Sequence, residues 1–205
     1  LAGRTLSQLE KKAPYLPESS RAAAERILAE REHIFAAFGA ITKRKISGKR
    51  IRSHGDYHLG QVLYTGKDFV IIDFEGEPAR PVSERRIKRS ALRDVAGMLR
   101  SFHYAARSAL MNERDRGLFH DEEAPVMAAW ADYWYWWVGA AFLRSYIEVG
   151  SQGDFLPETP EEFDVLMDAF LMEKAVYEIG YEMNNRPDWI DIPIEGIEQL
   201  LGKEA

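Results

Sequence analysis

Two short polar segments carry the residue types best suited to chemistry. The first acidic loop, residues 54–61, reads His-Gly-Asp-Tyr-His-Leu-Gly-Gln, and the second acidic loop, residues 72–78, reads Ile-Asp-Phe-Glu-Gly-Glu-Pro. Between them, the sequence reads as two short strands joined by a turn at 66–68. Because a hairpin brings its open ends together, we expect Asp56 and Asp73 at the same end of this ribbon. Two carboxylates in so small a volume repel each other, so the pattern predicts a cation or a positive partner between them.

This set of residues suits phosphoryl transfer. That reaction uses one carboxylate to orient the attacking hydroxyl and take its proton, and an amide oxygen with a second carboxylate to hold magnesium. Protein kinases supply these groups as Asp-x-x-x-x-Asn, a hairpin and Asp-Phe-Gly. Here the corresponding pattern is Asp56-x-x-x-x-Gln61 followed by Asp73-Phe74-Glu75.

The two loops resemble those of the aminoglycoside and choline phosphotransferase superfamily, distant relatives of protein kinases. More narrowly, four segments in the same order resemble bacterial maltokinases, namely 54–63, 72–78, 92–102 and 174–189. Maltokinases phosphorylate maltose at C1 with ATP and are often fused to trehalose synthase. The resemblance therefore implies that maltose is converted to maltose 1-phosphate and that ATP and Mg²⁺ are required. It leaves open whether a trehalose synthase domain belongs to the same parent chain.

The resemblance also implies roles for individual residues. Asp56 would be the catalytic base, and Gln61 and Asp73 would bind magnesium, with Gln61 in place of the superfamily's usual Asn. Glu75 is a candidate ligand of a second metal. The residues implied to bind the sugar are Lys174, Tyr177, Glu178, Tyr181 and Arg186. The first four of these fall on one helix face, which suits a packing or solvated face equally well.

The elements that position these residues are mostly helical. Apolar spacing predicts helices over 1–12, 19–40, 91–111, 121–149, 160–184 and 194–202, with Ser19 or Ser20 as the N-cap of the second. A basic linker is predicted at 42–52 and an irregular loop at 77–90. The predicted fold class is mainly α with a small β-hairpin, in one catalytic lobe over 1–205.

By resemblance, this is the C-terminal lobe of a protein-kinase-like fold of the aminoglycoside phosphotransferase type. No Gly-rich loop and no Val-Ala-Ile-Lys-like strand precedes the first helices. We therefore expect the N-terminal lobe to be absent and the chain alone to have little or no activity. An exposed cleft of this kind is a candidate surface for a homodimer of the fragment.

Composition narrows the class of protein. The 205 residues carry a net charge of -6 and no cysteine, which favours neither a nucleic-acid partner nor a disulfide framework and suits a cytoplasmic protein. No segment approaches the ~20 apolar residues of a membrane span, so no membrane partner is expected. Two other functions stay open, a phosphotransferase for another hydroxyl acceptor such as an aminoglycoside or a different sugar, and a non-catalytic sugar-binding fragment.

Several residues near the loops have structural interpretations. His54 is expected to brace the first acidic loop, whereas the role of His58 stays open. Asp94, in the first turns of a predicted helix, is expected to bond free backbone N–H groups. The aromatic run at 130–137 is expected to form core and to contact the other lobe.

Overall fold

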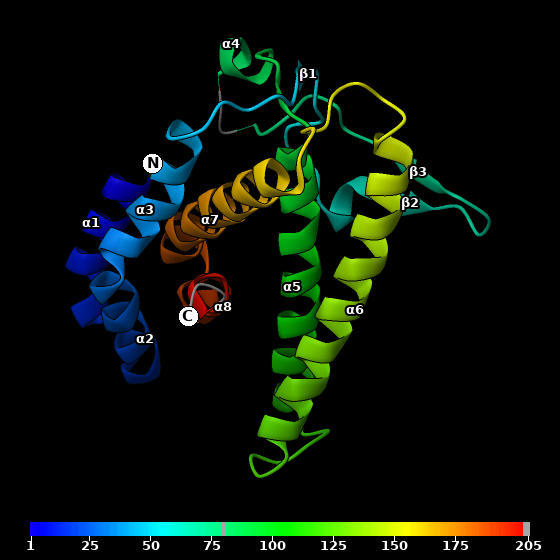
Figure 1. The fold of residues 1–205 in the computed structure, drawn as a ribbon. Helices are drawn as coiled ribbons and strands as arrows, with labels where there is room; N and C mark the ends of the chain where they lie inside the picture. Colours follow the sequence, from blue (N-terminus) through cyan, green and yellow to red (C-terminus); the bar gives the residue numbers. More distant parts are fainter. Residues whose placement is uncertain (79–80, 203–205) are drawn as a thin grey trace. The chain divides into compact units, whose positions relative to one another are not determined.

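The computed structural model describes residues 1–78 and 81–202 and confirms a mainly helical chain with a small β-hairpin (Figure 1). It also contains a second small antiparallel sheet. The chain divides into two compact units, Leu1–Ser47 with Pro157–Ala205, and Gly48–Leu156. In the described ranges, none of the helices combines the length and the apolar character needed to cross a bilayer.

The first unit is built from helices around one aliphatic core. Its elements are α1 (Ala2–Lys12), η1 (Ala13–Tyr15), α2 (Glu18–Ala29), α3 (Arg31–Thr42), α7 (Pro160–Asn185), η3 (Pro187–Trp189) and α8 (Asp191–Leu201). Helix α7 contacts α1, α3 and α8. Fully buried aliphatic side chains hold these helices together, among them Leu6, Leu9, Ile27, Ile34, Ile179, Ile194 and Ile197.

The predicted helix over 19–40 is in fact two helices, because the chain breaks between α2 and α3. The predicted cap was also wrong: Pro17 is the N-cap of α2, with φ −51° and ψ 151°. Ser20 lies inside the helix, where its buried hydroxyl donates a hydrogen bond to Asp191 Oδ2 at 3.1 Å. A serine that appears to be a cap in the sequence is therefore a buried contact between α2 and α8.

The second unit contains both sheets and two long helices. Its elements are β1 (Arg50–Ile51), η2 (Leu59–Gln61), β2 (Val62–Tyr64), β3 (Phe69–Ile71), α4 (Val82–Arg85), β4 (Arg89–Ser90), α5 (Leu92–Asp115) and α6 (Ala124–Gly150). The predicted hairpin is confirmed, with Val62 opposite Ile71 and Tyr64 opposite Phe69. The β1–β4 ladder and α4 lie in segments predicted to be irregular, because two-residue strands are too short to show alternation.

Helices α5 and α6 pack side by side (Figure 1). Gly139 of α6 allows close approach, since a Cβ there would lie 3.3 Å from Leu99 Cδ2. Phe102 of α5 makes edge contacts with Trp134 and Phe142 at ring-centroid distances of 6.5 and 5.6 Å. Trp134 nevertheless stays 45% exposed, and Trp130, Tyr133 and Trp137 are more exposed still. The expectation that the run contributes to the core was therefore wrong for these side chains, and its contact with another lobe stays a prediction.

A buried histidine in α5 makes the fold sensitive to acid. His103 is 1% exposed, and its Nδ1 accepts a hydrogen bond from Arg100 Nη1 at 3.2 Å. Burial lowers the pKa of His103 to about 2, and the charges of Arg100 and Arg107 act in the same direction. The side chain is therefore neutral in the folded protein.

We expect the free energy of unfolding to fall as the pH drops below about 6.5, because His103 is protonated in the unfolded chain and stays neutral in the folded chain. The expected loss is roughly 2 kcal/mol at pH 5. Urea unfolding at pH 7.5 and pH 5 measures it, and His103→Asn should reduce the difference because Asn keeps an acceptor near Arg100 without titrating. Equal pH dependence in both proteins would contradict the assignment.

Candidate active site

The hairpin brings the two acidic loops together at its open end. Ile72 N donates a hydrogen bond to Gln61 O at 3.0 Å, which extends the β2–β3 ladder by one pair. Beyond it, Gln61 Nε2 donates to Asp73 Oδ2 at 3.1 Å. Asp73 has φ +61°, a left-handed conformation that is uncommon for a residue other than glycine and is often found at functional sites. The two loops therefore meet at the open end of the hairpin through Gln61 and Asp73, and the convergence of the Asp56 and Asp73 carboxylates stays a prediction.

His54 ties the first acidic loop to the second. Its ring is buried, and Nε2 lies 2.7 Å from Ile72 O. Since a carbonyl oxygen can only accept, Nε2 carries the hydrogen, which leaves Nδ1 to accept from Asp56 N at 3.4 Å. The ring also contacts Phe74 and Tyr57 at centroid distances of 5.0 and 5.5 Å. Both ring nitrogens are thus engaged, which confirms His54 as a brace.

One face of α5 holds the first acidic loop at three successive points. Asp94 accepts hydrogen bonds from His54 N at 2.6 Å and from Gly55 N at 2.9 Å. Ser101 Oγ accepts from Leu59 N at 3.0 Å. Between them, Gly97 leaves room for the backbone, because a Cβ at this position would lie 2.7 Å from Tyr57 O. Positions 94, 97 and 101 share one helix face, so the first turns of α5 form a cradle for the loop.

Asp94 is the most buried charge in this cradle. Its brace role is confirmed, although the N–H groups that it binds belong to the loop and not to its own helix. Burial raises the pKa of Asp94, and the hydrogen bonds from Gly55 and His54 offset part of that rise. Burial and then the charge of Asp94 raise the pKa of Tyr57, and the same two causes raise that of Tyr146 to about 12. Both phenols therefore stay protonated beside the carboxyl group.

Asp56 lies inside the loop that α5 positions. Its side chain is 17% exposed, and its Oδ2 lies 3.9 Å from His58 Nε2. The other ring nitrogen of His58 accepts from Gly60 N at 3.1 Å and so caps η2. The loop thus presents a half-buried carboxylate with its backbone fixed on both sides.

Gln61 and Asp73, the predicted magnesium ligands, lie in contact, so their positions are compatible with one shared ion. Magnesium prefers oxygen ligands and needs only one or two protein groups when a substrate phosphate completes its shell. Rotating the Gln61 amide would turn its oxygen towards Asp73, an arrangement that is favourable only with a cation between them. In the described part of the chain, no three His, Asp or Glu side chains gather into a possible metal site. Glu75 therefore does not join Asp56 and Asp73 in one cluster, and its role at a second metal stays a prediction.

The residues implied to bind sugar all lie in or just after α7, in the other unit. Lys174 Nζ lies 5.1 Å from the Tyr177 ring centroid, and Glu178 is 8% exposed. Tyr181 is 46% exposed, and the Arg186 guanidinium lies 5.5 Å from its ring centroid. The structure thus places them along the C-terminal half of α7 and just beyond it, with Tyr181 and Arg186 both exposed.

Arg186 is fixed by contacts that the sequence did not predict. Its Nε and Nη2 donate to the two carboxylate oxygens of Glu182 at 2.9 and 2.8 Å, and the Glu182 side chain is 1% exposed. The guanidinium also stacks 4.4 Å from the Trp189 ring centroid. A bidentate pair of this kind fixes the orientation of the guanidinium, so Arg186 is held in place by its neighbours.

Sequence reasoning missed Gly97, Ser101 and Glu182 as positioning residues. A glycine inside an otherwise strong helix pattern was the available signal for Gly97, because glycine costs helix stability unless space requires it. Ser101 and Glu182 gave no such signal, since both are ordinary on a helix surface. Their partners come from loops and turns whose positions only the fold determines.

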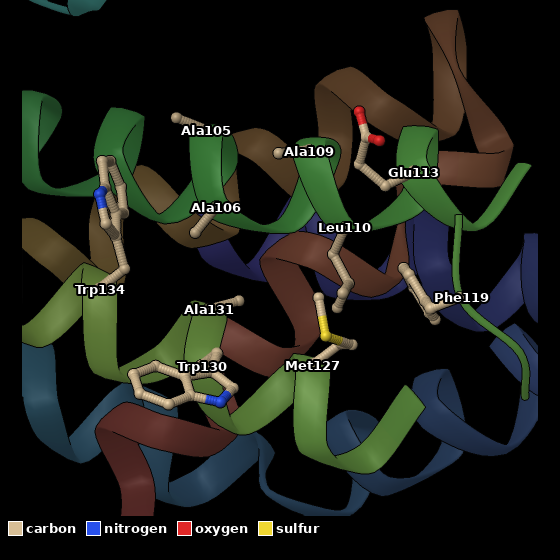
Figure 2. Close-up of a pocket in the computed structure, with 10 residues that line it drawn as sticks. All are labelled: Ala105, Ala106, Ala109, Leu110, Glu113, Phe119, Met127, Trp130, Ala131 and Trp134. Carbon is tan, nitrogen blue, oxygen red and sulfur yellow. The ribbon is translucent and has the colours of Figure 1, made fainter. Parts of the chain in front are cut away.

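A separate apolar cavity of about 400 Å³ lies between α5 and α6. It contains none of the residues predicted to act in catalysis, metal binding or sugar binding. Figure 2 shows alanines of α5 facing Met127, Trp130 and Trp134 of α6, with the carboxylate of Glu113 directed away from them. Glu113 is instead paired with Arg116 at 3.1 Å. The cavity therefore offers a ligand few polar groups to orient it.

Comparisons with known proteins find sequence similarity to glucosamine kinases. No protein-family model matches it. The glucosamine kinase of Streptacidiphilus jiangxiensis is 28% identical over 149 residues, which cover 72% of this chain and 31% of that protein. The glucosamine kinase of Mycolicibacterium smegmatis (strain ATCC 700084 / mc(2)155) is 28% identical over 182 residues, which cover 86% of this chain and 41% of that protein.

Solved structures show the fold. A glucosamine kinase in complex with glucosamine, ADP and inorganic phosphate has a TM-score of 0.75 at 22% identity, covering 99% of this chain and 47% of that chain. Crystal form B of a glucosamine kinase gives 0.74 at 22% identity and covers 100% of this chain and 45% of that chain. The chain thus has the fold of the matching part of these kinases and spans less than half of their length.

Proposed function

We propose that this chain is the part of an ATP-dependent sugar kinase that carries the catalytic base and the magnesium ligands. The observation that carries the proposal is the hairpin end, where Gln61 contacts Asp73 at 3.1 Å and His54 ties the loop of Asp56 to Ile72. Carboxylate, amide and second carboxylate are the groups that phosphoryl transfer requires. The similarity to glucosamine kinases supports the same reaction class.

In this proposal Asp56 orients a hydroxyl of the acceptor sugar and takes its proton as the oxygen attacks the γ-phosphorus of ATP. The bond between γ-phosphorus and the bridging oxygen breaks, and ADP leaves. Asp94, Gly97 and Ser101 act as positioning residues, because they fix the backbone on both sides of Asp56. Small displacements of a reacting group are costly, so this fixation contributes to rate.

Gln61 and Asp73 would hold Mg²⁺, which neutralises charge on the phosphates when it is bound. Asp73 contributes the negative charge and Gln61 the neutral oxygen. Glu75 is a candidate for a second ion. The bound ADP and phosphate named for one solved glucosamine kinase support a nucleotide as phosphoryl donor.

Maltose is the acceptor that we propose first, with phosphorylation at C1. Its support is the maltokinase resemblance of segments 54–63, 72–78, 92–102 and 174–189. We propose that Lys174, Tyr177, Glu178, Tyr181 and Arg186 bind the sugar. Arg186 is neutralised by Glu182 and stacked on aromatic rings, which gives this helix end mixed hydrogen-bonding groups and an aromatic surface. Such a surface suits a neutral disaccharide.

Glucosamine is the second candidate acceptor, because both curated relatives are glucosamine kinases. Its ammonium group would require an accessible carboxylate or an aromatic cage. Glu178 is the one carboxylate among the residues proposed to bind the sugar, and it is only 8% exposed. The burial of Glu178 counts against a carboxylate contact with the ammonium group, whereas the exposed Tyr181 ring suits either acceptor.

Phosphorus NMR on the full-length protein that carries this chain separates these proposals. The protein is incubated with ATP and Mg²⁺, and with maltose or glucosamine in parallel samples. We expect a sugar 1-phosphate signal with maltose that requires all three additions and is lost in Asp56→Asn. A new phosphate ester with glucosamine alone would replace maltose by the second candidate. If no acceptor is phosphorylated across a panel of sugars and aminoglycosides that includes these two, the kinase proposal is contradicted.

A further inference from the structure

The outer face of α6 carries a continuous row of exposed apolar side chains, which we call the aromatic stripe. It consists of Val126, Trp130, Tyr133 and Trp137, which are 55–63% exposed. Their spacing of i, i+4, i+7 and i+11 places them on one side of the helix, as in helices that pack along a seam. Neighbouring rings touch, with centroids 5.8 Å apart for Trp130 and Tyr133 and 6.0 Å for Tyr133 and Trp137.

Most of the stripe lies away from the side of α6 that packs on α5, and only Trp130 of its four residues also lines the apolar cavity between the two helices. That inner side is marked by Gly139 against Leu99 and by Tyr135, whose ring lies 5.2 Å from His103. A large exposed aromatic surface is unusual on a free protein and commonly marks a contact with another surface. Nothing in the chemistry proposed for the acidic loops requires it.

We propose that the aromatic stripe is a homodimer interface in which α6 packs antiparallel against α6 of a second copy, about a two-fold axis near Tyr133. A two-fold axis makes each copy present the same patch to the other, so the patch must be complementary to itself. An apolar, nearly uncharged stripe meets this requirement.

The area of the stripe is adequate for such a contact. At ~150–250 Å² per fully buried aromatic side chain, its half-exposed residues offer roughly 500 Å² for burial. Met127 and Trp134 flank the stripe and are 37% and 45% exposed. With these and the small residues beside them, the surface approaches the ~800 Å² per partner of a standard interface.

Charge favours a second copy in the antiparallel direction. Asp132 is the only formal charge between Ala124 and Leu143, and it is paired with Arg107 at 2.7 Å. Two chains of net charge -6 can therefore meet here without close like charges. The acidic run 121–123 lies directly before α6, and the exposed Arg144 follows the stripe. In an antiparallel pair centred near Tyr133, Arg144 faces Glu122 and Glu123 of the second copy, whereas a parallel pair would place the acidic runs together.

Analytical ultracentrifugation of the full-length protein that carries this chain, over a range of concentrations, tests the interface. We expect a dimer, and we expect Trp130→Glu and Trp137→Glu each to raise the dissociation constant at least tenfold. Val149→Glu is the matched control, because Val149 is on the same helix and 68% exposed but lies about 120° around the helix from Trp137. A monomeric wild-type chain, or equal dissociation in the control, would overturn the proposal. Circular dichroism confirms that each variant is folded, as expected for exposed positions.

Charge reversal tests the antiparallel direction without changing any residue of the aromatic stripe. Arg144→Glu should weaken the dimer, and adding Glu122→Lys and Glu123→Lys should restore it. Because the chain contains no cysteine, a single Tyr133→Cys also reports the centre of the interface through a short thiol cross-linker. Failure of both the rescue and the cross-link would overturn the antiparallel arrangement.

Discussion

Replacing Asp73 with Asn is expected to lower kcat/KM of the full-length protein by at least about a hundredfold. Asn has nearly the same shape and can keep the contact that Gln61 makes with Oδ2 at 3.1 Å. What it removes is the negative charge that would hold magnesium beside the amide oxygen. The remaining activity should need a higher Mg²⁺ concentration, which a magnesium titration of the phosphoryl-transfer rate measures.

Asp68→Asn is the matched control for this substitution. Asp68 lies in the turn at the closed end of the same hairpin, where its Oδ1 accepts from Phe69 N at 2.7 Å. Asn retains that acceptor, so rate and magnesium requirement should stay at the wild-type level. Wild-type turnover in Asp73→Asn at limiting magnesium would remove Asp73 from the proposed metal site.

The Gly97→Ala substitution is expected to disturb the first acidic loop, although alanine normally favours helices. The new Cβ would lie 2.7 Å from Tyr57 O, so α5 and the loop must separate. The helix propensity gain of about 1 kcal/mol is smaller than the ~1–3 kcal/mol that overpacking typically costs. Because Tyr57 follows Asp56 directly, we also expect kcat to fall about tenfold or more.

Gly39→Ala separates the clash from the general effect of the substitution. Gly39 lies in α3, and a Cβ there meets nothing within 4 Å, so alanine should stabilise the chain by up to about 1 kcal/mol. Urea unfolding of both variants therefore gives changes of opposite sign. A stabilised Gly97→Ala variant with normal turnover would show that the loop tolerates the displacement.

The local parts of the site could be predicted from the sequence. The strands around 62–64 and 69–71, and the approach of Gln61 to Asp73, follow from alternation, turn residues and the geometry of a hairpin. The long helices α5, α6 and α7 follow from apolar spacing within one or two turns of their ends. These features depend on residues close together in the chain.

The contacts that join distant segments could not be predicted in this way. Ser101 has no property that identifies it as the partner of Leu59 N, since that contact depends on how α5 meets the loop. The break between α2 and α3 occurs within a continuous helical pattern. The aromatic run at 130–137 was expected to form core and to contact the other lobe, but the sequence could not tell which side chains do which, and the fold leaves Trp130 and Trp137 exposed on α6.

The contacts between the cradle on α5 and the first acidic loop involve main-chain atoms of the loop. Asp94 and Ser101 bind the N–H groups of residues 54, 55 and 59, and Gly97 accommodates the carbonyl of residue 57. The Tyr57 ring contacts His54 at a centroid distance of 5.5 Å, but the Leu59 side chain is 39% exposed and takes no part in these bonds. Substitutions at position 59 can therefore alter the surface beside the site while Asp56 keeps its place, which separates change at that surface from the geometry of the reaction.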